Sequence, residues 1–100
     1  MKLGRVVGTV VSTIKSSGLN SHKLLLVCPL DLAADSVASK DGETFVAIDL
    51  AGAGEHEIVL VSYGSAARIS AGTSDVPTDA AIVAVVDNVQ IGERNAYSKG

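Results

Sequence analysis

Two stretches that are apolar at successive positions most constrain what this 100-residue chain can fold into. They are Leu24–Cys28 and Ala80–Val86. A strand of an antiparallel sheet with one wet face alternates apolar and polar side chains, so both faces of these two stretches are expected to be covered. A chain of this length forms one domain with a single core. The outer faces therefore need a second surface, and an identical copy in a symmetric ring or dimer is the simplest one.

Composition excludes several classes of protein. Hydrophobic residues make up 47% of the chain and charged residues 19%, a balance that is too apolar for intrinsic disorder. No apolar run approaches the roughly 18 residues of a membrane helix, so we expect a soluble, intracellular protein without membrane contact. A formal net charge of −3 and only two Tyr and one Phe argue against nucleic-acid binding. The single cysteine, Cys28, forms no internal disulfide and completes no thiolate zinc site within one chain.

Strand signals dominate the chain. The segment Leu3–Ile14 is rich in Val and Thr and is expected to be a long strand, in which Gly4 and Gly8 share one face and let the strand bend. Proline cannot donate a ladder hydrogen bond, so Pro29 is expected to end the second strand. The four further strands are predicted at Lys23–Leu30, Glu43–Leu50, Glu57–Tyr63 and Ala81–Ile91.

The connections are short. Asp31–Lys40 is expected to be a loop, and Ser65–Ser70 one or two helical turns with Ser65 as the N-cap. The tail Gly92–Gly100 is mostly polar. Five strands with such connections predict an all-β fold, a small five-stranded OB-like β-barrel with one or two short helical turns. No domain boundary is visible, so residues 1–100 form a single domain.

An ordered series of segments resembles a known family. The series consists of Lys2–Thr13, Lys23–Val27, Val46–Asp49, Gly52-Ala53-Gly54 followed by Glu57, Gly64–Arg68 and Pro77–Asp87. In this order and spacing it resembles the bacterial microcompartment vertex proteins of the EutN/CcmL type, over roughly positions 2–89. Ala66 departs from the pattern, because the family usually carries a second serine there.

The resemblance implies a structural role. Members of that family are small β-barrels that form homopentamers, and these pentamers occupy the vertices of polyhedral shells built mainly from hexagonal tiles. The expected partners are therefore further copies of this chain and hexameric shell proteins, and the expected location is a microcompartment shell in the bacterial cytoplasm. Such a protein needs no catalytic residue, cofactor or metal of its own, so we expect it not to be an enzyme.

The segment Gly52, Ala53 and Gly54 is a candidate loop. It follows a predicted strand, but no helix follows it and position 57 is Glu, so a dinucleotide fingerprint is not formed. One interpretation is a tight loop that uses positive φ. In a ring, the other interpretation is a loop that faces the five-fold axis and shapes a narrow pore.

Arg68 is the candidate for an interface or structural ion pair, with a solvated arginine and direct ligand binding as the alternatives. It is the only basic residue between Lys40 and Arg94, and a guanidinium in an apolar setting needs a planar acceptor. Asp49, Asp79 and Asp87 are candidate partners within or between subunits. Ser65 is expected to cap a helical turn or to donate a hydrogen bond at an interface. The sequence Gly64-Ser65-Ala66 lacks the second glycine of a nucleophile elbow.

Two other function classes stay open at this point. An OB-like nucleic-acid or ligand-binding module would share the fold, although it should carry a basic groove with interleaved aromatic residues. A small oligomeric enzyme could build a site at the boundary between subunits, with residues from both. A pocket of adequate size at such a boundary would favour the enzyme.

Overall fold

Eight β-strands make up most of the described part of the chain. The structure is a computed structural model and describes residues 1–11, 23–32, 37–39, 43–64, 67 and 79–99. The strands are β1 (Lys2–Val10), β2 (Leu24–Leu32), β3 (Val37–Ser39), β4 (Phe45–Asp49), β5 (Ile58–Tyr63), β6 (Ala80–Val85), β7 (Asn88–Ile91) and β8 (Arg94–Ser98).

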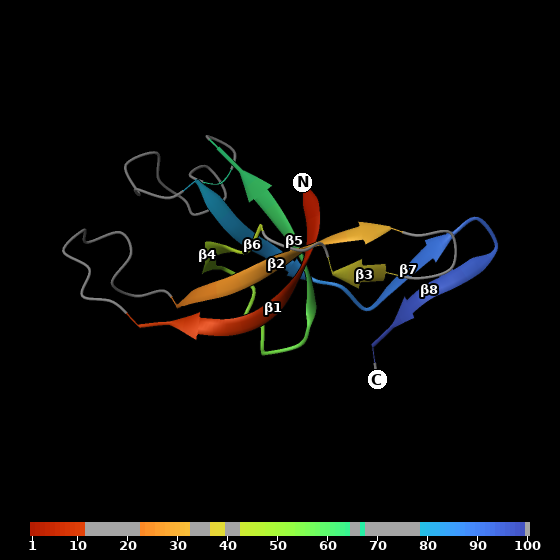
Figure 1. Cartoon of the computed structure of the whole chain (residues 1–100), viewed down its shortest axis with the longest axis horizontal. Helices are drawn as coiled ribbons and strands as arrows, with labels where there is room; N and C mark the ends of the chain where they lie inside the picture. Colours follow the sequence, from red (N-terminus) through yellow and green to blue (C-terminus); the bar gives the residue numbers. More distant parts are fainter. Residues whose placement is uncertain (12–22, 33–36, 40–42, 65–66, 68–78, 100) are drawn as a thin grey trace.

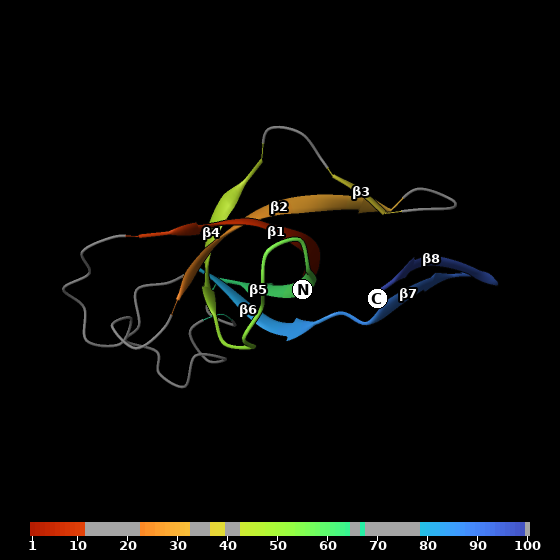
Figure 2. The same ribbon diagram turned by 90° about the horizontal axis from the view of Figure 1, so that it is seen from below.

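Five of these strands close into a barrel (Figures 1 and 2). The strand order is β1-β5-β6-β4-β2, and a further pairing of β1 with β2 completes the circle. The β4–β6 pair is parallel, while the other neighbours in the barrel run antiparallel. The short strand β3 pairs with the far end of β2. The five-stranded barrel predicted from the sequence is confirmed.

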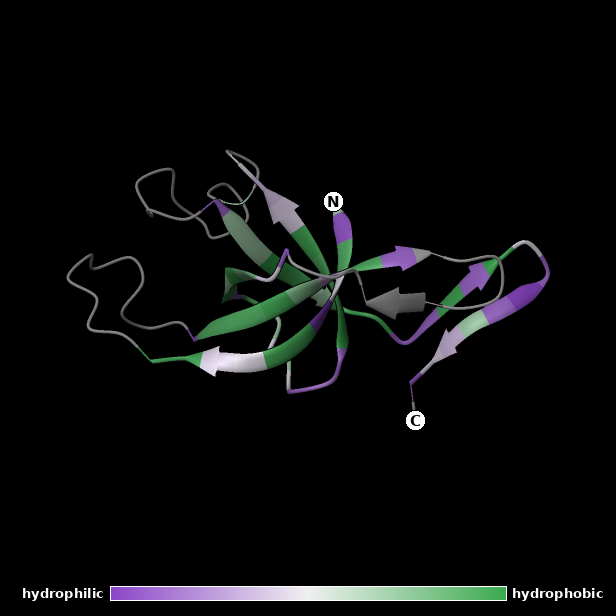
Figure 3. Ribbon diagram, in the orientation of Figure 1, coloured by the Kyte–Doolittle hydropathy of each residue, from purple (hydrophilic) through white to green (hydrophobic). Residues whose placement is uncertain are grey.

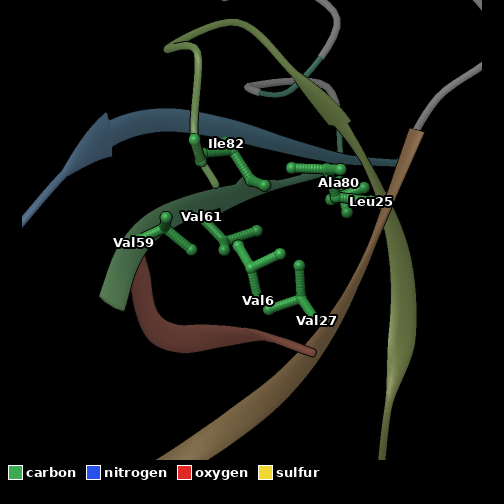
Figure 4. Close-up of a cluster of buried hydrophobic side chains, with 9 residues drawn as sticks. Val6, Leu25, Val27, Val59, Val61, Ala80 and Ile82 are labelled. Carbon is green, nitrogen blue, oxygen red and sulfur yellow. The ribbon is translucent and has the colours of Figure 1, made fainter. Parts of the chain in front are cut away.

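The core is a dry cluster of mostly β-branched side chains inside the barrel (Figure 4). Strand register places Val6 opposite Val27, and Val61 opposite Ile82, so that paired side chains point to the same interior. Branched aliphatic side chains fill the inside of a small barrel well. The buried members of the cluster are Val6, Leu25, Val27, Ala47, Ala53, Val59, Val61, Ala80 and Ile82.

Strand β1 bends at a bulge between Val6 and Gly8, where the register with β2 shifts. The prediction that Gly4 and Gly8 share a face is therefore wrong. A Cβ on Gly4 would collide with the Val27 side chain in the interior, whereas a Cβ on Gly8 would lie 3.8 Å from Leu26 Cβ. One extra residue in the bulge turns everything after it to the opposite face, which a strict two-residue period does not anticipate.

Strand β2 continues through Pro29 to Leu32, so the prediction that Pro29 ends it is wrong. Leu24–Val27 pair with β4, and Leu30–Leu32 pair with β3. Pro29 lies between these two paired stretches, where a missing N–H interrupts the ladder least. Strand β3 also corrects the expectation that Asp31–Lys40 is entirely loop.

The predicted single strand Ala81–Ile91 is two strands, β6 and β7. The chain leaves the barrel at Val86 and Asp87, and β7 then pairs in a separate hairpin with β8, which lies in the expected polar tail. A continuous run of strand-forming residues does not reveal where a strand changes its partner, because the hydropathy pattern on either side is the same.

The predicted helical turns over Ser65–Ser70 lie outside the described residues, except for Ala67. Ala67 is buried, and its N–H donates to the carbonyl of Gly64 at 3.1 Å, as expected for a turn. Among the described residues, no helix has the length and apolar character needed to cross a membrane.

We predict that Gly4→Ala destabilises the barrel by about 1–3 kcal/mol, because the added methyl group overpacks the core against Val27. Chemical denaturation of the purified protein measures this change. Gly8→Ala is the matched control on the same strand, and its effect is expected to stay within about 1 kcal/mol. Equal effects at the two positions would contradict the packing described for Gly4.

Candidate subunit interface

An apolar surface runs over the outside of β1, β2 and β4. We call it the outer stripe and define it by five residues, which are Val7, Val10, Leu24, Leu26 and Val46. Register aligns Gly8, Leu26 and Val46 in one row, and Val10, Leu24 and Ile48 in the next. Paired side chains share a face, so the stripe continues across three adjacent strands. Figure 3 shows the hydrophobic colour along the first half of β2.

The outer stripe is left partly open to solvent. Val7 and Val46 are each 43% exposed, and Leu24 and Leu26 are half-buried. Single exposed apolar residues are common, but a contiguous apolar patch without a charged member marks an interaction site. This surface is the physical basis of the expectation that the barrel packs against another copy.

The chain itself covers the adjoining part of the outer face. Ile48, Ala81 and Ala67 form a second buried cluster, with Leu24 and Leu50 among the half-buried residues packed against it. Ile48 and Ala81 are register partners on β4 and β6. Ala67 thus covers the outer face around Ile48 and Ala81 and reaches the edge of the outer stripe at Leu24, while Val7 and Val46 stay 43% exposed.

Asp49 organises the candidate loop that follows β4. Its Oδ1 accepts the N–H groups of Ala51 and Gly52 at 3.0 Å each, and its Oδ2 accepts that of Ala53 at 3.0 Å. The residue is 7% exposed, so this carboxylate replaces water as the partner of three backbone donors. Lys23 Nζ lies 3.8 Å from Oδ2 and is largely exposed, so the ion pair contributes little beside these hydrogen bonds.

The end of this loop is attached to β1. The N–H of His56 donates to the carbonyl of Val6 at 2.7 Å, and the N–H of Val6 donates to the carbonyl of Glu57 at 3.0 Å. Arg5 Nη1 donates to the carbonyl of His56 at 2.7 Å. His56 is exposed and adopts a φ of 71°. These bonds fix the loop on the barrel wall.

Glu57 joins the same loop to the end of the C-terminal hairpin. Its Oε1 accepts the N–H of Gly54 at 2.6 Å, and its Oε2 lies 2.5 Å from Lys99 Nζ. The hydrogen bond from Lys99, with that from Gly54, lowers the pKa of Glu57, and the bond to Glu57 raises the pKa of Lys99. Both groups are therefore charged at neutral pH.

The structure places the candidate loop residues as follows. Gly52 has a φ of 75°, which confirms the tight-loop interpretation at that position. Ala53 is buried in the barrel core, while Gly52 and Gly54 are exposed. The pore-lining role of the loop stays a prediction.

The candidate ion pair of Arg68 also stays a prediction, because Arg68 and Ser65 lie outside the described residues. Asp49 has a role that the sequence reasoning missed, as acceptor for the backbone of the following loop. An aspartate two to four residues before a glycine-rich turn was the available signal. Asp79 is exposed, and its carbonyl accepts the N–H of Gly64 at 2.9 Å. Cys28 is half-buried.

A groove of about 590 Å³ opens at one end of the barrel. Phe45 and Tyr63 form a ring pair there with centroids 5.5 Å apart, and Lys2 Nζ lies 5.7 Å from the Tyr63 centroid. Burial raises the pKa of the Tyr63 phenol. The described residues that line it are Met1, Lys2, Leu3, Pro29, Leu30, Asp31, Glu43, Phe45, Leu60 and Tyr63, which include no serine, cysteine or histidine nucleophile.

Metal ligands are not gathered in the part of the chain that the structure describes. There, no group of three or more His, Cys, Asp or Glu side chains could hold an ion. The polar groups described above hold backbone segments in place. Asp49 holds the loop after β4, and Glu57 holds both the end of that loop and Lys99 at the end of the hairpin.

Comparison with known proteins assigns the family. The family model described as "Ethanolamine utilisation protein EutN/carboxysome" matches residues 1–87. The chain belongs to the EutN/CcmL family. This confirms the resemblance seen in the sequence. The matched residues comprise the whole barrel and end at Asp87, immediately before β7.

Individual relatives agree with this assignment. The bacterial microcompartment shell vertex protein GrpN of Rhodospirillum rubrum (strain F11) is 48% identical over 90 residues, which are 90% of this chain and 97% of GrpN. The solved structure "Carboxysome Subunit, CcmL" superposes with a TM-score of 0.87 at 43% identity and covers 100% of both chains. The structure "GrpN pentameric microcompartment shell protein from Rhodospirillum rubrum" has a TM-score of 0.76 at 43% identity and covers 91% of this chain and 99% of its own.

We predict that Asp49→Ala destabilises the protein by about 1–3 kcal/mol, because three backbone N–H groups lose their acceptor. Glu55→Ala removes an exposed carboxylate and serves as the control, with an expected change within about 0.5 kcal/mol. Urea denaturation of both variants measures the difference. A cost for Asp49→Ala no larger than that of the control would refute the capping role of Asp49.

We predict that the link between Glu57 and Lys99 holds over a window of pH set by both pKa shifts. Because the folded-state pKa of Glu57 is lowered from 4.5, its contribution to stability is present above that value and is lost as the pH falls through the lowered pKa. The pKa of Lys99 is raised from 10.5, so its contribution is present below 10.5 and is lost as the pH rises through the raised pKa.

Titration of the Glu57 carboxyl ¹³C signal by NMR checks this prediction. In Lys99→Met the midpoint should move up toward 4.5, while the Gly54 N–H keeps part of the shift. A midpoint that is the same with and without Lys99 would show that the ion pair does not form in solution.

Proposed function

We propose that five copies of this chain form a closed ring that occupies a vertex of a bacterial microcompartment shell. The observation that carries this proposal is the outer stripe, an apolar surface that a single barrel leaves open. Membership of the EutN/CcmL family supports it, since the relative GrpN is named a shell vertex protein and its solved structure is described as pentameric. The location of the chain is therefore the shell.

The role of such a ring is geometric. Six-fold tiles alone form flat sheets or tubes, and a closed polyhedron needs positions of five-fold symmetry. A pentamer uses two different surfaces of each subunit, each contacting the other kind on the next copy, and closes after five. Neither surface requires a nucleophile, an acid–base pair or a metal, and the chain is a structural protein in this proposal.

The proposal extends to partners and to the ring axis. The outer edges of the pentamer would contact hexameric shell proteins. These six-fold tiles would form the flat faces of the polyhedron. The loop Gly52–Gly54, held rigidly by Asp49 and Glu57, would line the opening at the five-fold axis. Arg68 would form its carboxylate pair at a boundary between subunits.

We predict that the purified chain is a pentamer by native mass spectrometry and shows five-fold rings in negative stain. Co-expression with hexagon-forming shell proteins should then yield closed polyhedra by electron microscopy, and omission of this chain should leave sheets or tubes. Val46→Asp introduces a charge into the outer stripe and should shift the protein toward smaller species. A folded monomer at micromolar concentration, or polyhedra that close without the chain, would overturn the proposal.

A further inference from the structure

The β7–β8 hairpin extends away from the barrel (Figures 1 and 2). The molecule measures 45 × 25 × 23 Å, and the hairpin occupies one end of its longest axis. An isolated two-stranded hairpin is at best marginally stable in water, because it has too little core of its own. Its position therefore calls for a surface on which it can pack.

The hairpin has one apolar face. Val89 and Ile91 are two residues apart on β7 and point to the same side, and register places Tyr97 opposite Val89. All three are half-buried, whereas Asn88 and Gln90 on the other side are exposed. We call Val89, Ile91 and Tyr97 the hairpin face. Register also places Arg94, an exposed residue next to the turn, opposite Ile91 at the edge of this face. The three residues of the hairpin face have the apolar and aromatic character of the centre of a protein interface.

Both ends of the hairpin are tied to the barrel. The N–H of Val86 donates to the carbonyl of Ile58 at 2.8 Å, and the N–H of Lys99 donates to the carbonyl of Asp87 at 2.7 Å. The side chain of Lys99 pairs with Glu57. The anchored hairpin points away from the outer stripe, since the end of β1 and the start of β2 lie toward the opposite end of the long axis (Figure 1). A subunit cannot cover its own outer stripe with its own hairpin.

We infer that the β7–β8 hairpin is an intersubunit arm, whose hairpin face covers the outer stripe of the next copy of this chain. The inference rests on the proposed pentamer and names the two unlike surfaces that a closed ring requires. Each subunit has the arm at one end and the acceptor surface toward the other end. The same head-to-tail contact can therefore repeat from one subunit to the next. The arm supplies Val89, Ile91 and Tyr97, and the stripe supplies valine and leucine side chains.

The groove at the barrel end is the competing acceptor, and its chemistry fits the arm less well. Lys2, Asp31 and Glu43 are among its lining residues. Covering these three charges would remove their hydration, and Arg94 is the one charged side chain of β7 and β8 on that side that could pair with any of them. The outer stripe has no charged member, so burial of the hairpin face there carries no such cost.

Site-directed cross-linking tests the inference in the full chain with Cys28→Ser as background. Ile91→Cys combined with Val46→Cys should give a ladder of covalent oligomers with a short bismaleimide, up to the closed ring. Gln90→Cys with Val46→Cys presents the opposite side of the same strand, and Ile91→Cys with Leu60→Cys probes the groove. Little product is expected from either control. A ladder from the groove pair in place of the stripe pair, or equal ladders from Ile91→Cys and Gln90→Cys, would overturn the inference.

A charge substitution tests the energetics. Ile91→Asp should raise the concentration at which the pentamer half-dissociates by at least about tenfold, whereas Gln90→Asp should leave it unchanged. Circular dichroism melts at a concentration where both variants are pentameric check that the barrel is intact. If the parent protein is not a pentamer, the proposed function fails. If it is a pentamer that Ile91→Asp does not weaken, only the arm fails and the vertex role stands.

Discussion

Closure of the barrel by the β1–β2 pairing is the interaction on which the rest of the structure depends. A closed five-stranded barrel has one small interior, and Val6, Val27 and their neighbours fill it. The remaining aliphatic side chains of the same strands must then face outward. The chain covers part of that outer surface around Ala67 and leaves Val7 and Val46 partly exposed. The proposed ring assembly rests on this division.

Much of the barrel could be predicted from sequence because its strands carry strong, regular signals. Alternation around Val6 and runs of apolar, strand-forming residues such as those around Leu25 and Ile82 indicated the five barrel strands. The errors occurred where one position departs from the period. The bulge at Gly8 turns Val10 outward, and Pro29 lies in a gap between two ladders. Neither effect can be seen without knowing which strand is the neighbour.

The candidate site was predicted less completely, and the reason is again physical. The glycine loop was recognised, but the two carboxylates that hold it were not. Asp49 accepts hydrogen bonds from the backbone N–H groups that follow it, and Glu57 pairs with Lys99, which lies 42 residues further along the chain. The hairpin was missed as a separate element, since Ala81–Ile91 reads as one uniform strand. Long-range partners decide these features, whereas local composition decides the barrel.

The carboxylate of Glu57 has a consequence for how the assembly responds to load. Its two oxygens hold the Gly54 end of the loop and the Lys99 end of the hairpin at the same time. If the loop lies at the centre of a ring and the hairpin at the seam between neighbours, this side chain joins the two, in addition to the backbone hydrogen bonds that hold each of them on the barrel. The width of the central opening would then depend on how tightly adjacent protomers bind each other.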